Sequence, residues 1–493
     1  MSHSPTHHIR QVDVAIIGAG TAGQNAFAQV SQVTDNLVII NDGYWTTTCA
    51  TVGCMPSKLL IAAAERAYHA CHSQQFGINT PCSTDTKAHS IIDGQQVMRR
   101  VRAERDRFTH FITEKIAGWD NAQKISGRAT INADGYIVVG NQIINATHII
   151  VATGSTPYIP DGWTDALGAT MLTSDTVFEL PDIPHSLAVI GAGAIGLELA
   201  QAFSRLGSQV TLLNHAHRIA GISDSHVNKK AIACLTQALN MQLGVEITEV
   251  SQQDGQAVIH YQDADNVSHC WQGDYVLVAT GRRNHLAEIG IENLGVVLDK
   301  HNRPQQLNEV TGQIADKNVY IIGDANAHLP LLHVASNEGF HAGQCVKDTI
   351  INDKQTQTVP QPTLPAMAVV FSEPQIANVG LSLTQIEEAG HRYVVGEVSF
   401  DNQGRSRVMG VNCGLLRIYA SMDKHHHGKI LGASMVAPDA EYIAHILATA
   451  MSNDLTINDL LNSPFYHPTI LEGLRTALRA TQAQLEQSQH KQH

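Results

Sequence analysis

Residues 12–23 read Val-Asp-Val-Ala-Ile-Ile-Gly-Ala-Gly-Thr-Ala-Gly, which joins a short apolar strand directly to a glycine-rich turn. A helix of small residues and a second strand at 37–40 follow. In this order the first glycine permits a tight turn, the second lets a pyrophosphate approach and the third packs helix on strand. The stretch therefore predicts a dinucleotide-binding site. Its candidate residues are Gly18, Gly20, Gly23 and, where an acid usually holds the ribose, Asn41 or Asp42.

The same pattern returns at residues 186–196, Ser-Leu-Ala-Val-Ile-Gly-Ala-Gly-Ala-Ile-Gly. One dinucleotide cannot occupy both turns, so the duplication predicts two nucleotide cofactors. An apolar strand ending in Thr-Gly-Ser (148–155) returns the chain to the first sheet, and 275–283 resembles it and closes the second module. A strand at 318–324 ends in an Asp that could bind a sugar or ribityl hydroxyl, or simply form a turn. The candidate cofactor-binding residues here are Thr153, Gly154, Ser155, Gly191, Gly193, Gly196, Asn214, Gly281, Arg282, Gly323 and Asp324.

Residues 49–58, Cys-Ala-Thr-Val-Gly-Cys-Met-Pro-Ser-Lys, follow the first module and precede an alanine-rich helix. In a regular helix the Cα atoms of Cys49 and Cys54 would lie roughly 8–9 Å apart, beyond the usual disulfide limit of about 7 Å. A disulfide there needs a distorted first turn. Because a helix amino terminus also stabilises a thiolate, the pair predicts a working dithiol rather than two unrelated buried thiols.

A second chemical candidate lies in residues 465–472, Phe-Tyr-His-Pro-Thr-Ile-Leu-Glu. His467 precedes a proline at a predicted helix start, and Glu472, one turn into that helix, could accept a hydrogen bond from its imidazole. Alone, His467 would be interpreted as a surface histidine. Beside a dithiol that must exchange protons with a substrate thiol, it becomes a candidate base.

Size and composition set the remaining limits. A chain of 493 residues suggests three domains, and a net charge of −13 argues against a nucleic-acid surface. We find no apolar run approaching the roughly 18 residues of a membrane span, and the polar start at 1–8 does not resemble a signal peptide, so we expect a cytoplasmic protein. The other cysteines lack metal-site spacing and are expected to be free thiols. They are Cys71, Cys82, Cys234, Cys270, Cys345 and Cys413.

Together these motifs resemble the flavin-dependent pyridine nucleotide disulfide oxidoreductases, and within them the dihydrolipoamide dehydrogenases and their close relatives. The resemblance runs from about Val12 to Arg479 and includes Leu331-Leu332-His333 with Glu338-Gly339. It implies FAD on the first glycine turn, with Leu332 and His333 among its contacts, and a nicotinamide nucleotide on the second. It also implies a homodimer in which His467 works at the disulfide of the partner subunit.

The same resemblance assigns roles within the dithiol segment. Cys49 resembles the exchange thiol that reacts with substrate, and Cys54 the thiol that faces the flavin. Lys58 resembles the family lysine near the reactive flavin nitrogen, paired with Glu198. The physical logic is that a lysine favours the anionic reduced ring and a carboxylate limits the cost of burying that lysine.

The expected fold is α/β, with two Rossmann-like dinucleotide-binding domains, for FAD and NAD(P), and a C-terminal α+β dimerisation domain. A cluster of prolines near residue 360 marks the entry to the last domain. The expected boundaries are 1–156 and 285–358 for the FAD-binding domain, 157–284 for the NAD(P)-binding domain, 359–480 for the dimerisation domain and 481–493 for a flexible tail.

The expected function is that of an FAD-dependent dihydrolipoyl dehydrogenase, which oxidises a dithiol such as dihydrolipoamide through a Cys49–Cys54 disulfide. Three departures from the family pattern matter: Thr46-Thr47-Thr48 before the dithiol, Tyr466 before the histidine, and Asn214 where NAD-preferring members carry Glu. The expected coenzyme is NAD, with NADP as the alternative. Alternative functions are an NAD(P)H-dependent disulfide reductase with another substrate, or a docked subunit of a 2-oxoacid dehydrogenase complex. A mercuric reductase is disfavoured because the tail carries no cysteine pair.

Overall fold

The computed structural model describes residues 9–80, 92–352 and 364–490. The chain forms two compact units: Met1–Pro56, Arg102–Tyr158 and Arg282–Gln361 in the first, and Ser57–Val101, Ile159–Gly281 and Pro362–His493 in the second. The predicted boundary between residues 358 and 359, the polar start at 1–8 and Cys82 lie outside the described residues.

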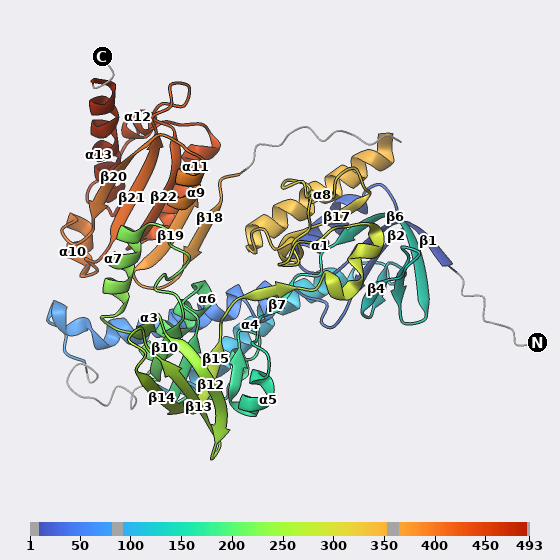
Figure 1. The fold of residues 1–493 in the computed structure, drawn as a ribbon, viewed down its shortest axis with the longest axis horizontal. Coiled ribbons are helices and arrows are strands. Elements are labelled where there is room, and N and C mark those ends of the chain that lie inside the picture. The colour runs from blue at the N-terminus through green and yellow to red at the C-terminus, as the bar shows by residue number, and fades with distance from the viewer. Residues whose placement is uncertain (1–8, 81–91, 353–363, 491–493) are drawn as a thin grey trace, which may run out of the picture. The chain divides into compact units, whose positions relative to one another are not determined.

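The first unit is built on a seven-stranded sheet of order β3-β2-β1-β6-β5-β4, with β17 also paired to β6 (Figure 1). Parallel pairing joins β1 to β2 and β6, β2 to β3, and β17 to β6, whereas β4 and β5 run antiparallel. The strands are β1 (Ile9–Ile17), β2 (Leu37–Asn41), β3 (Lys124–Ser126), β4 (Ala129–Ile131), β5 (Ile137–Val139), β6 (Gln142–Val151) and β17 (Val319–Ile321). The apolar ends of the central strands are buried on both faces, as a parallel sheet requires.

Helices α1 (Thr21–Val30) and α8 (Leu332–Asn352) pack together on one face of this sheet (Figure 1). A short antiparallel pair, β7 (Ser155–Pro157) and β16 (Arg282–Asn284), also belongs to the first unit. The dithiol segment forms α2 (Thr48–Thr51) and then begins α3 (Cys54–Cys71). The division between the two units falls within α3 and again within α4 (Gly94–Ala117).

The second unit contains a five-stranded parallel sheet of order β11-β10-β9-β15-β8. A separate antiparallel sheet, β12-β13-β14, lies in the same unit. The strands are β8 (Met171–Thr173), β9 (Ser186–Ile190), β10 (Gln209–Asn214), β11 (Asn240–Leu243), β12 (Glu246–Gln253), β13 (Gln256–Gln262), β14 (Ser268–Gly273) and β15 (Tyr275–Val278). The accompanying helices are α5 (Trp163–Leu167), α6 (Ala194–Arg205) and α7 (Ser225–Leu235).

The C-terminal part of the second unit is an antiparallel sheet of order β18-β19-β22-β21-β20. Its strands are β18 (Met367–Val370), β19 (Gln375–Gly380), β20 (Tyr393–Ser399), β21 (Leu415–Ser421) and β22 (Ile430–Ala437). Its helices are α9 (Leu383–Glu388), α10 (Gly404–Met409), α11 (Ala440–Ser452), α12 (Ile457–Leu461) and α13 (Leu471–His490). The fold is therefore α/β with two Rossmann-like modules and a C-terminal α+β region, as the sequence predicted.

Two expectations were wrong. The tail from residue 481 is not flexible up to His490, because α13 continues through it and buries Thr481 and Leu485. Cys234 and Cys413 are not free thiols: they form a disulfide between α7 and the segment before β21, with Cα atoms 6.0 Å apart. They are 179 residues apart in the chain, so no local spacing could reveal the pairing. None of the described helices combines the length and apolarity that crossing a membrane requires.

Candidate active site

The first glycine-rich turn has the shape of a pyrophosphate cradle. Gly18 has a φ of +107°, and a Cβ there would collide with the carbonyl oxygen of Ala152. A Cβ at Gly23 would collide with the carbonyl oxygen of Gly18, so α1 packs this closely only because glycine stands at both positions. Around Gly20, no described atom lies within 4 Å of the Cβ position. The turn is therefore open where a phosphate would approach the backbone.

Asn41 ties this turn to the chain that follows β2. Its Oδ1 accepts a hydrogen bond from the backbone nitrogen of Ala19 at 3.0 Å, and its Nδ2 donates to the carbonyl oxygen of Tyr44 at 2.9 Å. The neighbouring Asp42 is exposed. Asn41 therefore braces the cradle through both ends of its side chain.

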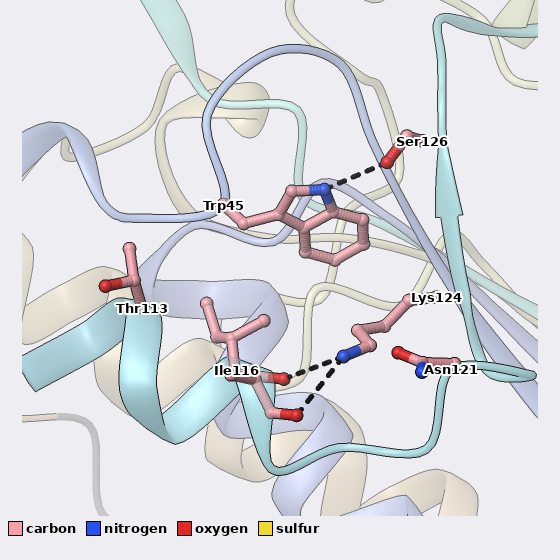
Figure 2. A pocket seen from close by; sticks show the side chains of 7 residues that line it. Trp45, Thr113, Ile116, Asn121, Lys124 and Ser126 are labelled. Atoms are coloured by element: carbon pink, nitrogen blue, oxygen red, sulfur yellow. Dashed lines mark hydrogen bonds between the residues drawn. The ribbon is translucent and has the colours of Figure 1, made fainter. Parts of the chain in front are cut away.

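A hollow of about 350 Å³ is lined by residues that include Trp45, Lys124 and Ser126 (Figure 2). It adjoins the end of β2, since Ser126 pairs with Asn41 in the sheet. Trp45 forms one wall, and its Nε1 donates to Oγ of Ser126 at 3.0 Å. Nζ of Lys124 donates to the carbonyl oxygen of Ile116 at 3.2 Å, in the last turn of α4. The lining mixes apolar side chains with polar ones: Trp45, Ile116 and Ala117 with Thr113, Asn121, Lys124 and Ser126.

The segment after β6 forms a polar cluster with the short turn of helix that follows β17, Gly323–Asn326. Oγ of Ser155 donates to Oδ2 of Asp324 at 2.7 Å, and Nε of Arg282 donates to the same Oγ at 2.8 Å. Arg282 therefore lies with the first module although the sequence placed it at the close of the second. Oγ1 of Thr153 is buried and has no hydrogen-bond partner among the described residues. An unsatisfied hydroxyl beside such a cluster fits a polar cofactor.

Glu338 on α8 holds the loop that follows β17. Its Oε2 accepts hydrogen bonds from the backbone nitrogen of Gly323 at 2.6 Å and from Nδ2 of Asn326 at 3.0 Å. Burial raises the pKa of this carboxyl to about 7, although the two hydrogen bonds act in the opposite direction. Leu332 and His333, at the start of the same helix, are exposed.

The second glycine-rich turn repeats the first in detail. Gly191 has a φ of +108°, and a Cβ there would collide with the carbonyl oxygen of Ala279. A Cβ at Gly196 would collide with the carbonyl oxygen of Gly191. The Cβ position of Gly193 again has no described atom within 4 Å. The structure therefore contains two cradles of one design, as the sequence duplication predicted.

Asn214 braces the second cradle as Asn41 braces the first. Its Oδ1 accepts from the backbone nitrogen of Ala192 at 2.9 Å, and its Nδ2 donates to the carbonyl oxygen of Ala216 at 2.6 Å. Both ends of the side chain are thus engaged within the protein. Three basic residues that follow it are exposed: His215, His217 and Arg218. Gly281, which follows β15, has a φ of +129° and no described atom within 4 Å of its Cβ position.

The dithiol segment is two helical pieces rather than one. Cys49 lies in the short α2, whose first turn is capped by the side chain of Thr47. Cys54 is the first residue of α3 and is exposed. Between them, a Cβ on Gly53 would lie 3.1 Å from the Cα of Cys49, so the chain doubles back onto Cys49 just before Cys54. The continuous helix that would hold the two sulfur atoms apart is absent from this segment.

Lys58 and Glu198 form an ion pair, with Nζ 2.6 Å from Oε2. Glu198 lies on α6, just after the second cradle, and only 7% of its side chain is exposed, against 34% for Lys58. A buried carboxylate needs such a partner, since an isolated buried charge is costly.

His467 and Glu472 also lie together. Nδ1 of His467 is 3.0 Å from Oε1 of Glu472, and the backbone nitrogen of Thr469 donates to Oε2 of Glu472 at 3.1 Å. The hydrogen bond with His467 is the main cause that lowers the pKa of the Glu472 carboxyl. The imidazole itself is 81% exposed on its side-chain surface, which leaves it accessible to another molecule.

The site residues are divided between the two units of the chain. The first unit holds Cys49, Cys54, the first cradle, Ser155 and Asp324, and the second holds Lys58, Glu198, the second cradle, His467 and Glu472.

Comparison with known proteins decides the family. Residues 12–339 match the model described as pyridine nucleotide-disulphide oxidoreductase, and residues 366–478 match the dimerisation domain of that description. The chain belongs to this family. It is an oxidoreductase that acts on sulfur groups, its cofactors are FAD and NAD(P), and its C-terminal sheet belongs to a dimerisation domain, which supports a homodimer.

Members of the pyridine nucleotide-disulphide oxidoreductase family resemble the chain along nearly its whole length. Dihydrolipoyl dehydrogenase 3 of Pseudomonas aeruginosa is 29% identical, with 94% of this chain and 97% of that protein covered. A mercuric reductase of Staphylococcus aureus is 28% identical, with 94% and 81% covered. The fold matches that of the HOCl-induced flavoprotein disulfide reductase RclA of Escherichia coli, with a TM-score of 0.76, 21% identity, and 95% and 99% covered.

The cofactors of this family fit the residues present. Each cradle has glycine where the backbone comes closest to neighbouring backbone atoms, and two such turns suit two pyrophosphates. The buried hydroxyl of Thr153, together with Asp324, suits a polar group of the cofactor at the first cradle. Gly18, Gly20, Gly23, Ser155 and Asp324 would hold FAD. The residues that would hold the nicotinamide nucleotide are Gly191, Gly193, Gly196 and Asn214.

Sequence reasoning missed three features of the site. Glu338 entered the resemblance through Glu338-Gly339, but its polar neighbours Ser336 and Asn337 gave no sign that its carboxylate is buried and holds the loop at Gly323. The hollow at Trp45 and Ser126 depends on strand pairing across the sheet, and no local pattern reveals it. Phe371, which contacts the Lys58–Glu198 pair, comes from a distant strand end.

Proposed function

We propose that this chain is a dihydrolipoyl dehydrogenase, which oxidises a dithiol of the dihydrolipoamide type through a Cys49–Cys54 disulfide and FAD, with NAD⁺ as acceptor. The observation that carries the proposal is the break at Gly53, which folds the chain back onto Cys49 just before Cys54. Because of this break, the separation of roughly 8–9 Å expected for a regular helix does not apply to the pair, which supports the disulfide that we propose. Cys54 at the start of α3 is also where a helix favours a thiolate.

Oxidation of the substrate begins with thiol–disulfide exchange at Cys49. A substrate thiolate attacks Sγ of Cys49, the bond between the two cysteine sulfurs breaks, and Cys54 leaves as a thiolate. The second substrate thiol then displaces Cys49 from the mixed disulfide, which releases the oxidised substrate and a second cysteine thiol. Two electrons enter the protein, and the protons of the substrate thiols pass to His467 and solvent. When bound, FAD supplies the relay that carries these electrons to NAD⁺.

His467 would act on the disulfide of the partner subunit in a homodimer. Support comes from its exposed imidazole, oriented by Glu472 at 3.0 Å, and from its position within the dimerisation domain. A carboxylate on Nδ1 leaves Nε2 as the free acceptor for a substrate proton. Lys58, paired with Glu198, would place one positive charge near the reactive edge of the flavin.

The first experiment is a spectrum with an assay grid. The purified protein should carry FAD, and addition of two electrons per flavin should produce a long-wavelength band from thiolate contact with the flavin. Dihydrolipoamide with NAD⁺ should turn over faster than glutathione disulfide with NADH or NADPH. Cys54→Ser should keep FAD and nucleotide binding but lose dithiol oxidation. Full turnover by that variant would refute the assignment. If the lipoyl substrate is protein-borne, co-purification with a lipoyl-bearing acyltransferase would follow.

The second experiment tests the dimeric site. His467→Gln and Cys54→Ser subunits, each inactive with dithiol, are co-expressed with different tags and the mixed dimer is isolated. If His467 acts on the partner's disulfide, one of the two sites in the mixed dimer retains both residues, and about half of the wild-type turnover returns. If His467 serves its own subunit, the mixed dimer stays as inactive as its parents.

A second candidate function is an NAD(P)H-dependent disulfide reductase. The observation that favours it is Asn214, a neutral residue whose side chain is already bonded to the protein, next to the exposed basic residues His215, His217 and Arg218. A neutral residue here does not repel the 2′-phosphate of NADP as an acid would. Faster turnover in the assay grid with NADPH and a disulfide would select this candidate.

A further inference from the structure

The turn between β18 and β19 is bound along one face of α6. Nε2 of Gln201 donates to the carbonyl oxygen of Glu373 at 2.9 Å, and its Oε1 accepts from the backbone nitrogen of the same residue at 2.7 Å. Nη1 of Arg205 lies 2.6 Å from Oε2 of Glu373. Glu198, Gln201 and Arg205 are three and four residues apart, so they share one face of the helix. The turn is therefore fixed to the helix that begins at the second cradle.

Phe371 begins this turn and contacts both members of the ion pair described above. Its backbone nitrogen donates to Oε1 of Glu198 at 2.9 Å, the oxygen that Lys58 does not use. Its ring lies beneath Nζ of Lys58, 4.5 Å from the ammonium nitrogen to the ring centroid. Phe371 is partly buried against the core that surrounds α6.

We propose that Phe371 is a positioning residue for Lys58. The negative face of an aromatic ring attracts an ammonium group, so the ring adds a second fixed partner to the one that Glu198 provides. The backbone of the same residue holds Glu198 in the rotamer that reaches Lys58. The C-terminal domain thereby sets where the charge of Lys58 lies. The contact between Phe371 and Lys58 does not depend on the proposed function. Only its effect on the flavin rests on that function, which would place the charge of Lys58 beside the flavin.

The first test measures Lys58 directly and does not involve electron transfer. Holoenzyme is labelled with an amine-reactive reagent, and the rate at Lys58 is followed by peptide mass spectrometry. Phe371→Leu keeps the backbone N–H and much of the bulk but removes the ring. It should raise the rate about two- to fivefold, the factor of a partly exposed cation–π contact. Phe371→Tyr should label at the wild-type rate, and so should Phe76→Leu, a ring removed from an exposed site in the same unit.

Two outcomes of the labelling would overturn the inference: Phe371→Leu at the wild-type rate, or Phe371→Tyr as fast as Phe371→Leu. The second outcome would mean that the fit of the side chain at position 371, and not its aromatic face, sets the labelling rate of Lys58. If Phe371→Leu melts well below wild type, Phe371→Met takes its place, because an unbranched side chain adapts to the gap without restoring a ring.

The second test measures the consequence for the flavin. Lys58→Gln should shift the flavin midpoint potential to a more negative value, since a nearby cation favours the anionic reduced ring. Phe371→Leu should produce a smaller shift in the same direction, and the double variant should equal Lys58→Gln alone. Additive shifts would overturn the inference. If Lys58→Gln has the wild-type potential while Phe371→Leu still speeds the labelling of Lys58, Lys58 does not act on the flavin. Phe371 would then remain the residue that positions Lys58.

Discussion

Oε2 of Glu338 lies 2.6 Å from the backbone nitrogen of Gly323, and this contact joins a helix of the first unit to the loop that carries Asp324. Both hydrogen bonds that Glu338 accepts converge on the same oxygen. The carboxyl is buried, and its pKa is raised from 4.5 to about 7. The folded protein therefore prefers this group protonated in a range where the unfolded chain has already lost the proton.

This preference gives a prediction for pH. Between about pH 4.5 and 7 the folded state binds more protons than the unfolded state, so the contribution of Glu338 to stability falls as pH rises through that window. The full loss is about 3 kcal/mol by the linkage relation. Glu338→Gln keeps an acceptor oxygen for Gly323 and cannot ionise. When the pH is raised from 5.5 to 8, the melting temperature of wild type should therefore fall further than that of Glu338→Gln. The two changes in melting temperature should differ by a few degrees.

The matched control is Glu309→Gln, an exposed glutamate in the same unit. It should follow the wild-type pH dependence of the melting temperature. A Glu338→Gln protein with an equally steep dependence would show that the carboxyl stays ionised in the folded state.

The brace at Asn214 gives a prediction for the coenzyme. Because the residue is neutral and both ends are bonded to the protein, wild type should discriminate between NAD⁺ and NADP⁺ by less than about tenfold in kcat/KM. Asn214→Glu adds a carboxylate that repels a 2′-phosphate, and it should shift the ratio toward NAD⁺ by at least about tenfold. Asn41→Glu, the equivalent change in the first cradle, should leave the ratio unchanged. An unchanged ratio in Asn214→Glu would place coenzyme selection elsewhere.

Local sequence patterns were sufficient to predict the two cradles and the dithiol, because each of these features depends on residues only a few positions apart. Gly18 and Gly191 could be assigned from the strand before and the helix after them, and the structure gives both nearly the same φ. The spacing of the two cysteines also led us to expect a distorted turn between them, and the structure has α2 end at Thr51 and α3 begin at Cys54, with Gly53 between them.

Features that depend on distant pairing were out of reach of the sequence. Cys234 and Cys413 meet only because α7 packs near β21, and Phe371 reaches Lys58 only because its turn binds α6. The continuation of α13 was missed for another reason: its glutamine-rich composition suggested a polar tail, while buried Leu485 shows a helix with one apolar face.

The Cys234–Cys413 disulfide should contribute to stability. It reinforces an interface that already contains Lys230 with Asp401, at 2.7 Å, and Tyr419 with Asp224, also at 2.7 Å. Closing a long loop typically adds about 2–4 kcal/mol. The double variant Cys234→Ser/Cys413→Ser should therefore melt several degrees below wild type.

Cys270→Ser, at an exposed free thiol, serves as the control and should melt as wild type does. Peptide mapping without reductant should recover the two cysteine peptides as one linked species. The prediction would be contradicted if Cys234 and Cys413 were both alkylated in unreduced protein and the double variant had the melting temperature of wild type.

The His467–Glu472 pair gives the sharpest kinetic prediction. His467→Gln removes the base and should lower kcat/KM for the dithiol by about 10²–10⁴-fold. Glu472→Gln keeps an acceptor for Nδ1 but removes the charge that supports the imidazole, so a smaller loss of about tenfold is expected. The hydrogen bond from His467 holds the pKa of Glu472 below its usual range, so the carboxylate is ionised in wild type at neutral pH and Glu472→Gln removes a charge that is present in the assay. Reduction of an artificial one-electron acceptor by NADH, which bypasses the disulfide, should be unchanged in both variants. A loss of that activity equal to the loss with dithiol would mean that the pair supports the fold rather than thiol chemistry.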